Sequence, residues 1–442
     1  MQKRGLNRII PSVKRDIMKK LVFFLVFLIG CPLKAEKLKV EVAALSAILM
    51  NAETGAILFE KEAHLSTYPA STTKVATALY LLEKRPETLD DTVVVTHEAV
   101  KKISPVIKQA AFDLHPSYLL ETDGTKMGLF LGEQLSLRDL LHGMMLMSGN
   151  DAANAIAKHL SGDINKFVDD LNLFLRSKGI QETHFLNPHG LHHPDHRTTA
   201  YDMALMTKEA LKYPYFREIV KTVKIPRPQT NKQPAGEMTQ YNRLLKPGPY
   251  YYPKAIGVKT GHTEKAGDPL VAAAVHEGRT LIAVLLEVKG RVTRYQDAIK
   301  LFDKAFAEKK VTRTLFTQKF DHFSRELKGA KTSLEASLAE DVELSFYPAE
   351  EPYFKSHVVW EVSSLPIAAG QKVGRLEIIT ENALILKSIP LLAVKNVEKV
   401  LWRAFVDGIS SRKKTLILSF LALNIACFLI YYFKKSQKVR KT

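Results

Sequence analysis

The sequence feature that most constrains the fold is a serine and a lysine three residues apart at the start of a helical pattern. Ser71 and Lys74 follow a proline-containing loop, and apolar residues then recur at helical spacing up to Lys84. Residues three apart on a helix lie on one face, so both side chains should point the same way. Two later segments, Ser148–Asn150 and Lys259–Gly261, complete the parts that a serine acyl-transfer enzyme with a lysine base requires.

The expected chemistry depends on the state of the lysine. A serine hydroxyl is a poor nucleophile until a base removes its proton. A lysine amine can do this only if its pKa falls well below ~10.4, which requires burial or nearby positive charge. We expect Ser71 to be the nucleophile and Lys74 its general base, with Lys259 close enough to lower the pKa of Lys74. Ser148 would relay a proton toward the leaving amine.

The other motif residues are expected to bind the substrate. Asn150 would hold a substrate amide, and Lys259 with Thr260 would bind a substrate carboxylate. Gly261, at a strand end, permits a close approach of backbone to ligand. The backbone N–H groups of His262 and of the nucleophile would form an oxyanion hole, where losing one donor typically costs ~100-fold or more in rate.

Each motif alone has a simpler interpretation. A lone Ser-Gly-Asn is most often a turn, and a lone Lys-Thr-Gly is most often a strand end or turn. Ser-x-x-Lys also occurs twice in the basic run 410–414. The occurrence of all three in this order, with the last one on a strand followed by a hairpin, favours an enzyme.

Hydrophobic periodicity predicts an α+β fold with strands at both ends of the main body and helices between them. An alternating hairpin is expected over 42–60, and a second hairpin over 269–288, following a strand that ends near Gly261. Helices are expected over 71–84, 135–147, 151–160, 164–178, 198–211 and 295–307. This pattern indicates an antiparallel β-sheet flanked by helices, with a helical insert, over residues 41–309. Short alternating segments separated by Pro and Gly predict a small all-β domain over 312–395.

The N-terminal residues predict an export signal. Basic residues up to Lys20 precede a short apolar run over 21–29, so residues 1–35 read as a signal sequence with cleavage after Ala35. The same run ending at Cys31 also resembles a lipoprotein signal, in which that cysteine would be lipidated. Met18 is an alternative start.

The C-terminal residues predict a membrane anchor. An amphipathic stalk is expected over 397–414, a membrane-spanning helix over 415–433 and a basic tail over 434–442. The larger cluster of basic residues follows the apolar run, which puts the tail in the cytoplasm. The catalytic body is therefore expected outside the cytoplasm, anchored in the bacterial cytoplasmic (inner) membrane.

The cysteine content and the charge distribution argue against a disulfide-stabilised body and against a nucleic-acid-binding protein. Only Cys31 and Cys427 occur, so no disulfide is expected in the body. The net charge of +18 lies partly in the two ends, and we expect no nucleic-acid partner. Positive charge in the body would favour an anionic wall or membrane surface.

A histidine-rich segment could suggest a metal site. His189, His192, His193 and His196 cluster with Asp195, but they lack a helical i, i+4 pair with a glutamate base. A polar surface loop is the preferred interpretation, and neither a metal nor an organic cofactor is expected.

The three motifs together resemble the superfamily of penicillin-binding proteins and serine β-lactamases. Within it, the chain looks like the low-molecular-weight penicillin-binding proteins that are D-alanyl-D-alanine carboxypeptidases, over roughly residues 42–395. The segments that carry the resemblance are 69–74, 146–152, 185–191, 242–245, 257–263 and 369–374.

The resemblance implies a β-lactamase/transpeptidase-like fold and a serine-type carboxypeptidase. Such an enzyme removes the terminal D-alanine from peptidoglycan stem pentapeptides through an acyl-enzyme at Ser71, and β-lactams acylate the same serine. Arg294 matches a family arginine near the substrate carboxylate. Peptidoglycan stem peptides and the cytoplasmic membrane are the implied partners.

The chain also departs from the family pattern. Residues 101–128 look longer than usual, and Asp268 stands where the family often has a bulky residue. The anchor looks like a spanning helix, whereas relatives often use an amphipathic surface helix. A DD-endopeptidase or a β-lactamase on the same fold, or a non-catalytic cell-wall scaffold, are the alternatives. The absence of a separate glutamate motif for fast deacylation counts against β-lactamase. The preferred stem peptide and the oligomeric state stay open.

Overall fold

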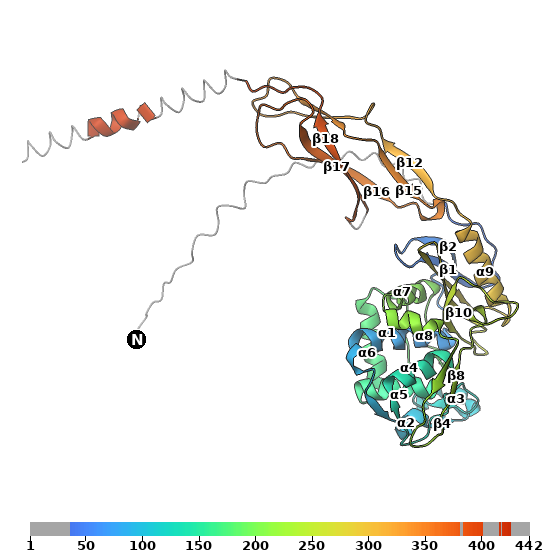
Figure 1. The fold of residues 1–442 in the computed structure, drawn as a ribbon. Coiled ribbons are helices and arrows are strands. Elements are labelled where there is room, and N and C mark those ends of the chain that lie inside the picture. Colours follow the sequence, from blue (N-terminus) through green and yellow to red (C-terminus); the bar gives the residue numbers. More distant parts are fainter. Residues whose placement is uncertain (1–35, 381–382, 401–414, 417, 426–442) are drawn as a thin grey trace, which may run out of the picture. The chain divides into compact units, whose positions relative to one another are not determined.

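The computed structural model describes residues 36–380, 383–400, 415–416 and 418–425, which belong to two compact units (Figure 1). The main unit holds residues up to Val311 together with the short segment 346–352. The β unit holds residues 312–345 and those from 353 onward. The chain therefore leaves the main unit, returns to it for seven residues and leaves it again.

A five-stranded sheet forms the centre of the main unit. All its neighbouring strands pair antiparallel. In sheet order the strands are β2 (Ile57–Lys61), β1 (Ser46–Asn51), β11 (Arg279–Leu286), β10 (Leu270–His276) and β9 (Ala255–Thr260). The first two and the last three strands of the unit thus come together, as the two predicted hairpins require.

The sheet buries both of its faces, each against a different set of helices. Successive side chains of a strand point to opposite faces, so Ile282 and Val284 of β11 enter one core while Ala283 and Leu285 enter the other. The first core is closed by α1 (Lys74–Lys84), α4 (Leu137–Leu146), α5 (Asn150–Ser161), α6 (Ile164–Ser177), α7 (Ala200–Ala210) and α8 (Pro214–Lys221). The second core is closed by α9 (Thr293–Phe306).

Side-chain caps explain where three of these helices begin. Ser136, Asp163 and Thr199 each accept a hydrogen bond from the backbone N–H three residues on, which satisfies a donor that the first helical turn leaves unpaired. The predicted helices therefore match the observed ones to within a few residues at each end. Helix α8 was not predicted; Pro214 occupies its first turn, where the missing N–H costs nothing.

Shorter elements surround the helical region. They are β3 (Thr92–Val94) paired with β6 (Gln134–Ser136), β4 (Lys102–Ile103) paired with β5 (Leu120–Glu121), β7 (Lys224–Arg227) paired with β8 (Gly236–Thr239), and the short helices α2 (His97–Val100) and α3 (Pro105–Ala110).

The β unit has its own sheet and its own core. Its strands are β13 (His322–Arg325), β14 (Leu334–Leu338), β18 (Ile385–Ala393), β17 (Lys372–Thr380) and β16 (Phe354–Trp360) in sheet order, with β12 (Val311–Phe316) and β15 (Val342–Phe346) in a separate pair. Leu376, Ile378 and Leu391 are among its buried residues. Val397 and Lys399 still form bridges to this unit, so its pairing continues beyond the predicted boundary at 395.

The expected fold class needs one correction, which concerns the predicted membrane-spanning helix over 415–433. Among the described residues, no helix is both long enough and apolar enough to cross a membrane. Residues 415–416 and 418–425 are helical, whereas a span needs about 20 residues. Residue 417 and residues 426–433 lie outside the described residues, as do the predicted signal 1–35, the stalk residues 401–414 and the tail 434–442. The α+β architecture of the main unit is as expected.

Candidate active site

Ser71 lies in a short 3₁₀ turn, Ala70–Thr73, that leads directly into α1. Ala70 has φ = +48°, a left-handed conformation that a residue with a side chain rarely adopts. The carbonyl oxygen of Ala70 faces Gly190, where an added Cβ would lie 1.8 Å from it. Only glycine at position 190 therefore allows this approach, and Gly190 packs directly against the turn that presents Ser71.

Lys74 occupies the first position of α1 with its side chain fully buried. Its Nζ lies 2.7 Å from Oδ1 of Asn150, 2.8 Å from the carbonyl oxygen of His189 and 3.0 Å from Oγ of Ser71. A neutral amine has two hydrogens and one lone pair. If the two oxygens that can only accept take the hydrogens, the lone pair is left toward the Ser71 hydroxyl. This is the geometry that a general base needs.

Burial holds the pKa of Lys74 well below its usual value. Desolvation is the largest cause, because the charged ammonium is excluded from water, and the positive charge of Lys259 adds to it. The carboxylate of Asp151 acts in the opposite direction. The surroundings therefore favour the neutral amine that can accept a proton from serine.

Ser148 and Lys259 form a second contact pair. Lys259 is on β9, Ser148 lies between α4 and α5, and Nζ of Lys259 is 2.9 Å from Oγ of Ser148. Lys259 also donates to the carbonyl oxygen of Thr260, and its side chain is 1% exposed. Burial, together with the charge of Arg294, lowers the pKa of Lys259 to about 7. Near neutral pH this amine can therefore exchange a proton with the Ser148 hydroxyl.

The low pKa of Lys259 makes stability depend on pH in a predictable direction. The lysine pKa is about 10.4 in an unfolded chain and about 7 in the folded protein. Between these values the unfolded state binds the extra proton, so the free energy of unfolding should rise with pH and fall as pH drops toward 7. Replacing Lys259 with methionine should flatten this rise by up to ~1.4 kcal/mol per pH unit.

Denaturant unfolding between pH 7 and 9 measures this slope. Lys221→Met, at an exposed position at the end of α8, is the matched control and should leave the slope as it is. An unchanged slope in Lys259→Met would mean that Lys259 keeps its ordinary pKa in the folded protein.

The predicted carboxylate-binding residues follow each other at the end of β9. Thr260 is largely buried and pairs with Leu270 of β10. Gly261 donates its N–H to the carbonyl oxygen of Pro269, and a Cβ there would lie 2.8 Å from the Pro269 ring. Nη1 of Arg294 donates to the carbonyl oxygen of Gly261 at 2.8 Å. The family arginine thus lies against the strand that bears Lys259.

One cleft of about 680 Å³ contains most of these groups. Ser71, Ser148, Asn150, Thr260, Gly261, His262 and Arg294 all line it. Lys74 and Lys259 lie beneath, in contact with its two serines. The structure thus brings together all nine predicted site residues, and their chemical roles stay predictions.

The cleft walls carry opposite charges. Lysine and arginine side chains outnumber acidic ones in the lining: besides Arg294 it includes Arg243, Lys246, Lys265 and Arg291. The acidic side chains of the lining are Glu121 and Asp123, from the segment 101–128, and Glu264. The cleft therefore suits a ligand with an anionic end.

Buried Lys108 ties this acidic segment to α3. Its side chain is 1% exposed, donates to the carbonyl oxygen of Leu119 and lies 3.5 Å from Glu121. Burial lowers the pKa of Lys108 and raises that of Glu121. Pro105 and Gln109 of α3 line the cleft beside them. Residues of the segment 101–128 thus form part of the cleft wall.

The histidine-rich segment was predicted to be a polar surface loop, and this prediction is wrong. His189 and His196 are fully buried, and burial is the main reason that the pKa of each lies well below its usual value. Nδ1 of His196 accepts the N–H of Leu186, so its hydrogen is on Nε2, which lies 2.9 Å from Oγ1 of Thr73. Thr73 in turn donates to the carbonyl oxygen of Ala70. His196 therefore supports the turn that presents Ser71.

Asp151 is a second residue whose place the sequence did not reveal. Its buried carboxylate accepts the backbone N–H groups of Met127, Gly128 and Leu129, and also that of Ala152. It therefore fastens a loop to the first turn of α5, whose N-cap is Gly149. Partners so distant along the chain leave no signal in local periodicity.

No group of three or more His, Cys, Asp or Glu side chains that could hold a metal ion occurs among the described residues.

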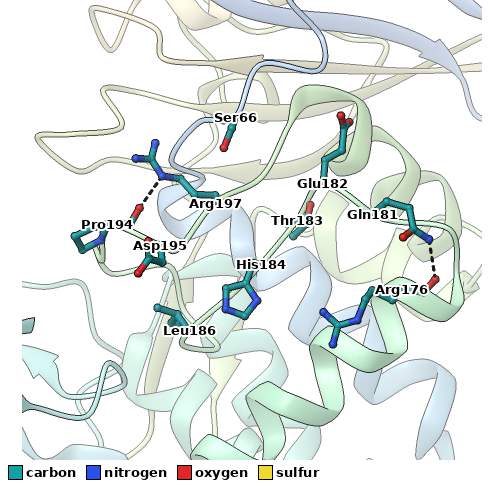
Figure 2. A pocket seen from close by; sticks show the side chains of 10 residues that line it. All are labelled: Ser66, Arg176, Gln181, Glu182, Thr183, His184, Leu186, Pro194, Asp195 and Arg197. Atoms are coloured by element: carbon teal, nitrogen blue, oxygen red, sulfur yellow. Dashed lines mark hydrogen bonds between the residues drawn. The ribbon is translucent and has the colours of Figure 1, made fainter. Parts of the chain in front are cut away.

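A second hollow of about 890 Å³ lies elsewhere on the main unit (Figure 2). Arg197, Pro194 and His184 are among its lining residues, and it includes none of the predicted site residues. The guanidinium carbon of Arg197 lies 3.6 Å from the centre of the Tyr68 ring, which shortly precedes Ser71 in the chain. This hollow therefore adjoins Tyr68, and none of its lining residues also lines the cleft.

Comparison with known proteins gives a consistent result. The family described as D-alanyl-D-alanine carboxypeptidase (peptidase S11) matches residues 33–290, more than half of the 442-residue chain. D-alanyl-D-alanine carboxypeptidase DacF of Bacillus subtilis is 29% identical over 360 residues, covering 80% of this chain and 86% of that protein. DacD of Salmonella typhimurium, of the same description, is 30% identical over 364 residues, with 80% and 86% covered.

Solved structures agree with the sequence relatives. Penicillin binding protein 5 from Haemophilus influenzae superposes with a TM-score of 0.56 at 25% identity, covering 82% of this chain and all of that one. Penicillin binding protein 6B from Escherichia coli gives a TM-score of 0.57 at 26% identity, covering 80% and 96%.

Proposed function

The chain belongs to the D-alanyl-D-alanine carboxypeptidase family, and from that premise we propose that it removes the terminal D-alanine from peptidoglycan stem pentapeptides through an acyl-enzyme at Ser71. The observation that carries this proposal is the buried Lys74, with its Nζ 3.0 Å from Oγ of Ser71 and its pKa lowered by burial. Two fixed acceptors orient that amine, so its lone pair is available to one hydroxyl only.

Acylation follows from these contacts. Nζ of Lys74 takes the proton of Ser71 while Oγ attacks the carbonyl carbon of the penultimate D-alanine. The backbone N–H groups of Ser71 and His262 would stabilise the oxyanion. The C–N bond then breaks, and the departing amine takes a proton from Ser148, which Lys259 replenishes across 2.9 Å. Free D-alanine leaves, and an ester on Ser71 remains.

Deacylation requires that Lys74 is neutral again. The proton that Lys74 took from Ser71 therefore passes first to solvent, and Lys259 regains a proton from solvent, which restores the starting charges. Water then attacks the ester while Lys74 accepts its proton, and Ser71 leaves with a proton returned by Lys74. A β-lactam would acylate Ser71 by the same first step. Its opened ring keeps the amine attached to the acyl group, which slows the attack of water.

The direct test is D-alanine release from a synthetic pentapeptide that ends in D-Ala-D-Ala. The matched control peptide ends in D-Ala-L-Ala and should release no alanine. Mass spectrometry of the penicillin-treated protein should place the added mass on the peptide that contains Ser71. Penicillin labelling without D-alanine release would indicate an acyl-transfer site with another substrate. The absence of both D-alanine release and penicillin labelling would contradict the proposal.

Two related activities can be separated by the same preparation. Fast turnover of nitrocefin would indicate a β-lactamase, and cleavage of cross-linked muropeptide dimers in preference to pentapeptides would indicate an endopeptidase.

The site of action that we infer is outside the cytoplasm, where peptidoglycan lies. The support is the sequence of residues 1–35, with basic residues followed by an apolar run. The mass of the N-terminal peptide of the mature protein tests this: a start at Glu36 or a lipid on Cys31 would each indicate export, whereas an intact Met1 would not.

A further inference from the structure

We propose that Asp268 is a positioning residue that sets how tightly the cleft holds the carboxylate end of its substrate. This inference rests on the proposed function, because it concerns the same cleft. Asp268 is only 6% exposed. It reaches the substrate only through the cleft residues that it contacts.

One oxygen of Asp268 meets three cleft residues. Its Oδ1 lies 3.0 Å from Nδ1 of His262, 3.8 Å from Nη1 of Arg294 and 3.8 Å from Nε of Arg291. All three of these side chains line the cleft. A single buried carboxylate is therefore shared by the groups that would surround an anionic ligand.

The turn before Asp268 fixes the position of its backbone. The N–H of Asp268 donates to the carbonyl oxygen of Val288, and the N–H of Thr263 donates to that of Gly267. Gly267 has φ = +67°, and a Cβ there would lie 2.5 Å from the carbonyl oxygen of Val288. The backbone of Asp268 thus stays in place without depending on His262 or the arginines.

The contact with His262 determines its tautomer. An ionised carboxylate can only accept hydrogen bonds, so Nδ1 of His262 must carry the hydrogen. The side chain of His262 is about half exposed, and this bond orients its ring at the cleft. Because the backbone N–H of His262 belongs to the expected oxyanion hole, Asp268 also steadies that residue.

Arg294 is held in place without help from Asp268. Its Nη1 donates to the carbonyl oxygen of Gly261 at 2.8 Å, and its side chain is 9% exposed. Its Nε is buried and has no hydrogen-bond partner among the described residues. The guanidinium therefore keeps its position and its positive charge at the cleft if Asp268 is replaced, and the charge of Asp268 offsets part of its attraction for an anion.

Replacing Asp268 with asparagine isolates the charge. The side-chain oxygen of asparagine can still accept from His262, while the negative charge beside Arg294 and Arg291 is lost. A peptide ending in a carboxylate should then bind about threefold to tenfold more tightly, as expected for a charge several ångströms away at intermediate dielectric. A C-terminally amidated peptide carries no charge there and should bind as before.

Binding is measured without turnover by NMR titration of the Ser71→Ala protein, with and without Asp268→Asn. The two ligands are the D-Ala-D-Ala pentapeptide and its C-terminal amide. Asp268→Glu keeps the negative charge, so its affinity for the carboxylate peptide should lie closer to that of the parent than to that of Asp268→Asn. Glu277→Gln, in the exposed turn between β10 and β11, is the matched control and should change neither affinity.

The same substitution in the active protein should lower KM severalfold while kcat changes less than about twofold. Equal tightening of both peptides, no tightening, or no measurable binding of the carboxylate peptide would each overturn the role of Asp268. Failure of the proposed function is distinguished from these outcomes, because it would appear as absence of D-alanine release from the unsubstituted protein.

Discussion

Replacing Lys74 with arginine should lower kcat/KM for D-alanine release by about 10²–10⁴-fold, the usual contribution of a positioned general base. Arginine keeps the positive charge but cannot be deprotonated in a protein, so it has no lone pair for the Ser71 proton. The buried site favours the neutral lysine, and this is the state that arginine lacks. A coupled D-alanine assay measures the release, and the Ser71→Ala variant gives the background rate.

A second variant separates base chemistry from charge. If Lys74 acts as the base, Lys74→Met should be as inactive as Lys74→Arg. If Lys74 contributes only positive charge, the arginine variant should retain most of the activity, which would contradict the mechanism. Lys84→Arg, at the exposed end of the same helix, is the matched control. Thermal unfolding of all variants shows whether each remains folded.

Replacing Arg279 with methionine should destabilise the protein by about 3–5 kcal/mol, the usual cost of breaking a buried ion pair by removing one partner. The side chain of Arg279 is 5% exposed and pairs with two largely buried carboxylates, 2.7 Å from Glu350 and 3.3 Å from Glu308. It also donates to the carbonyl oxygen of Ala305. Without it, two neighbouring buried carboxylates lose their counter-charge.

Urea unfolding measures this loss. Arg176→Met, at an exposed position near the end of α6, is the control and should change the free energy of unfolding by less than about 0.5 kcal/mol. Burial raises the pKa of Glu308 even with Arg279 present, so acidification should partly relieve the variant. A loss below about 1 kcal/mol would mean that the two carboxylates find other partners or water.

Local sequence patterns were sufficient for the elements that position the nucleophile. The helical pattern after Pro69 placed Ser71 and Lys74 on adjacent positions of one turn, and their contact at 3.0 Å follows from that spacing. Ser136, as the cap of α4, was likewise readable from the three-residue spacing to Asp139. These inferences need only neighbours along the chain.

Contacts between distant segments could not be read in this way. Lys259 meets Ser148 across 111 positions, and His196 meets Thr73 across 123. Periodicity says nothing about such pairs, and His196 was therefore assigned to the surface although it is fully buried. The charge of Asp268 was visible in the sequence, but its three partners depend on how β9, β10 and α9 meet. Burial in the folded chain, and not residue type, decides the state of each of these groups.

The return of residues 346–352 to the main unit has a consequence for how such proteins can evolve. These seven residues are encoded within the β unit, yet they supply Glu350 to Arg279 and to Asn51. A recombination event that exchanged everything after Val311 would bring a foreign segment to this position and leave Arg279 without its closest carboxylate. In this chain the segment before Val311 is therefore expected to be inherited together with residues 346–352, because the main unit is complete only with both.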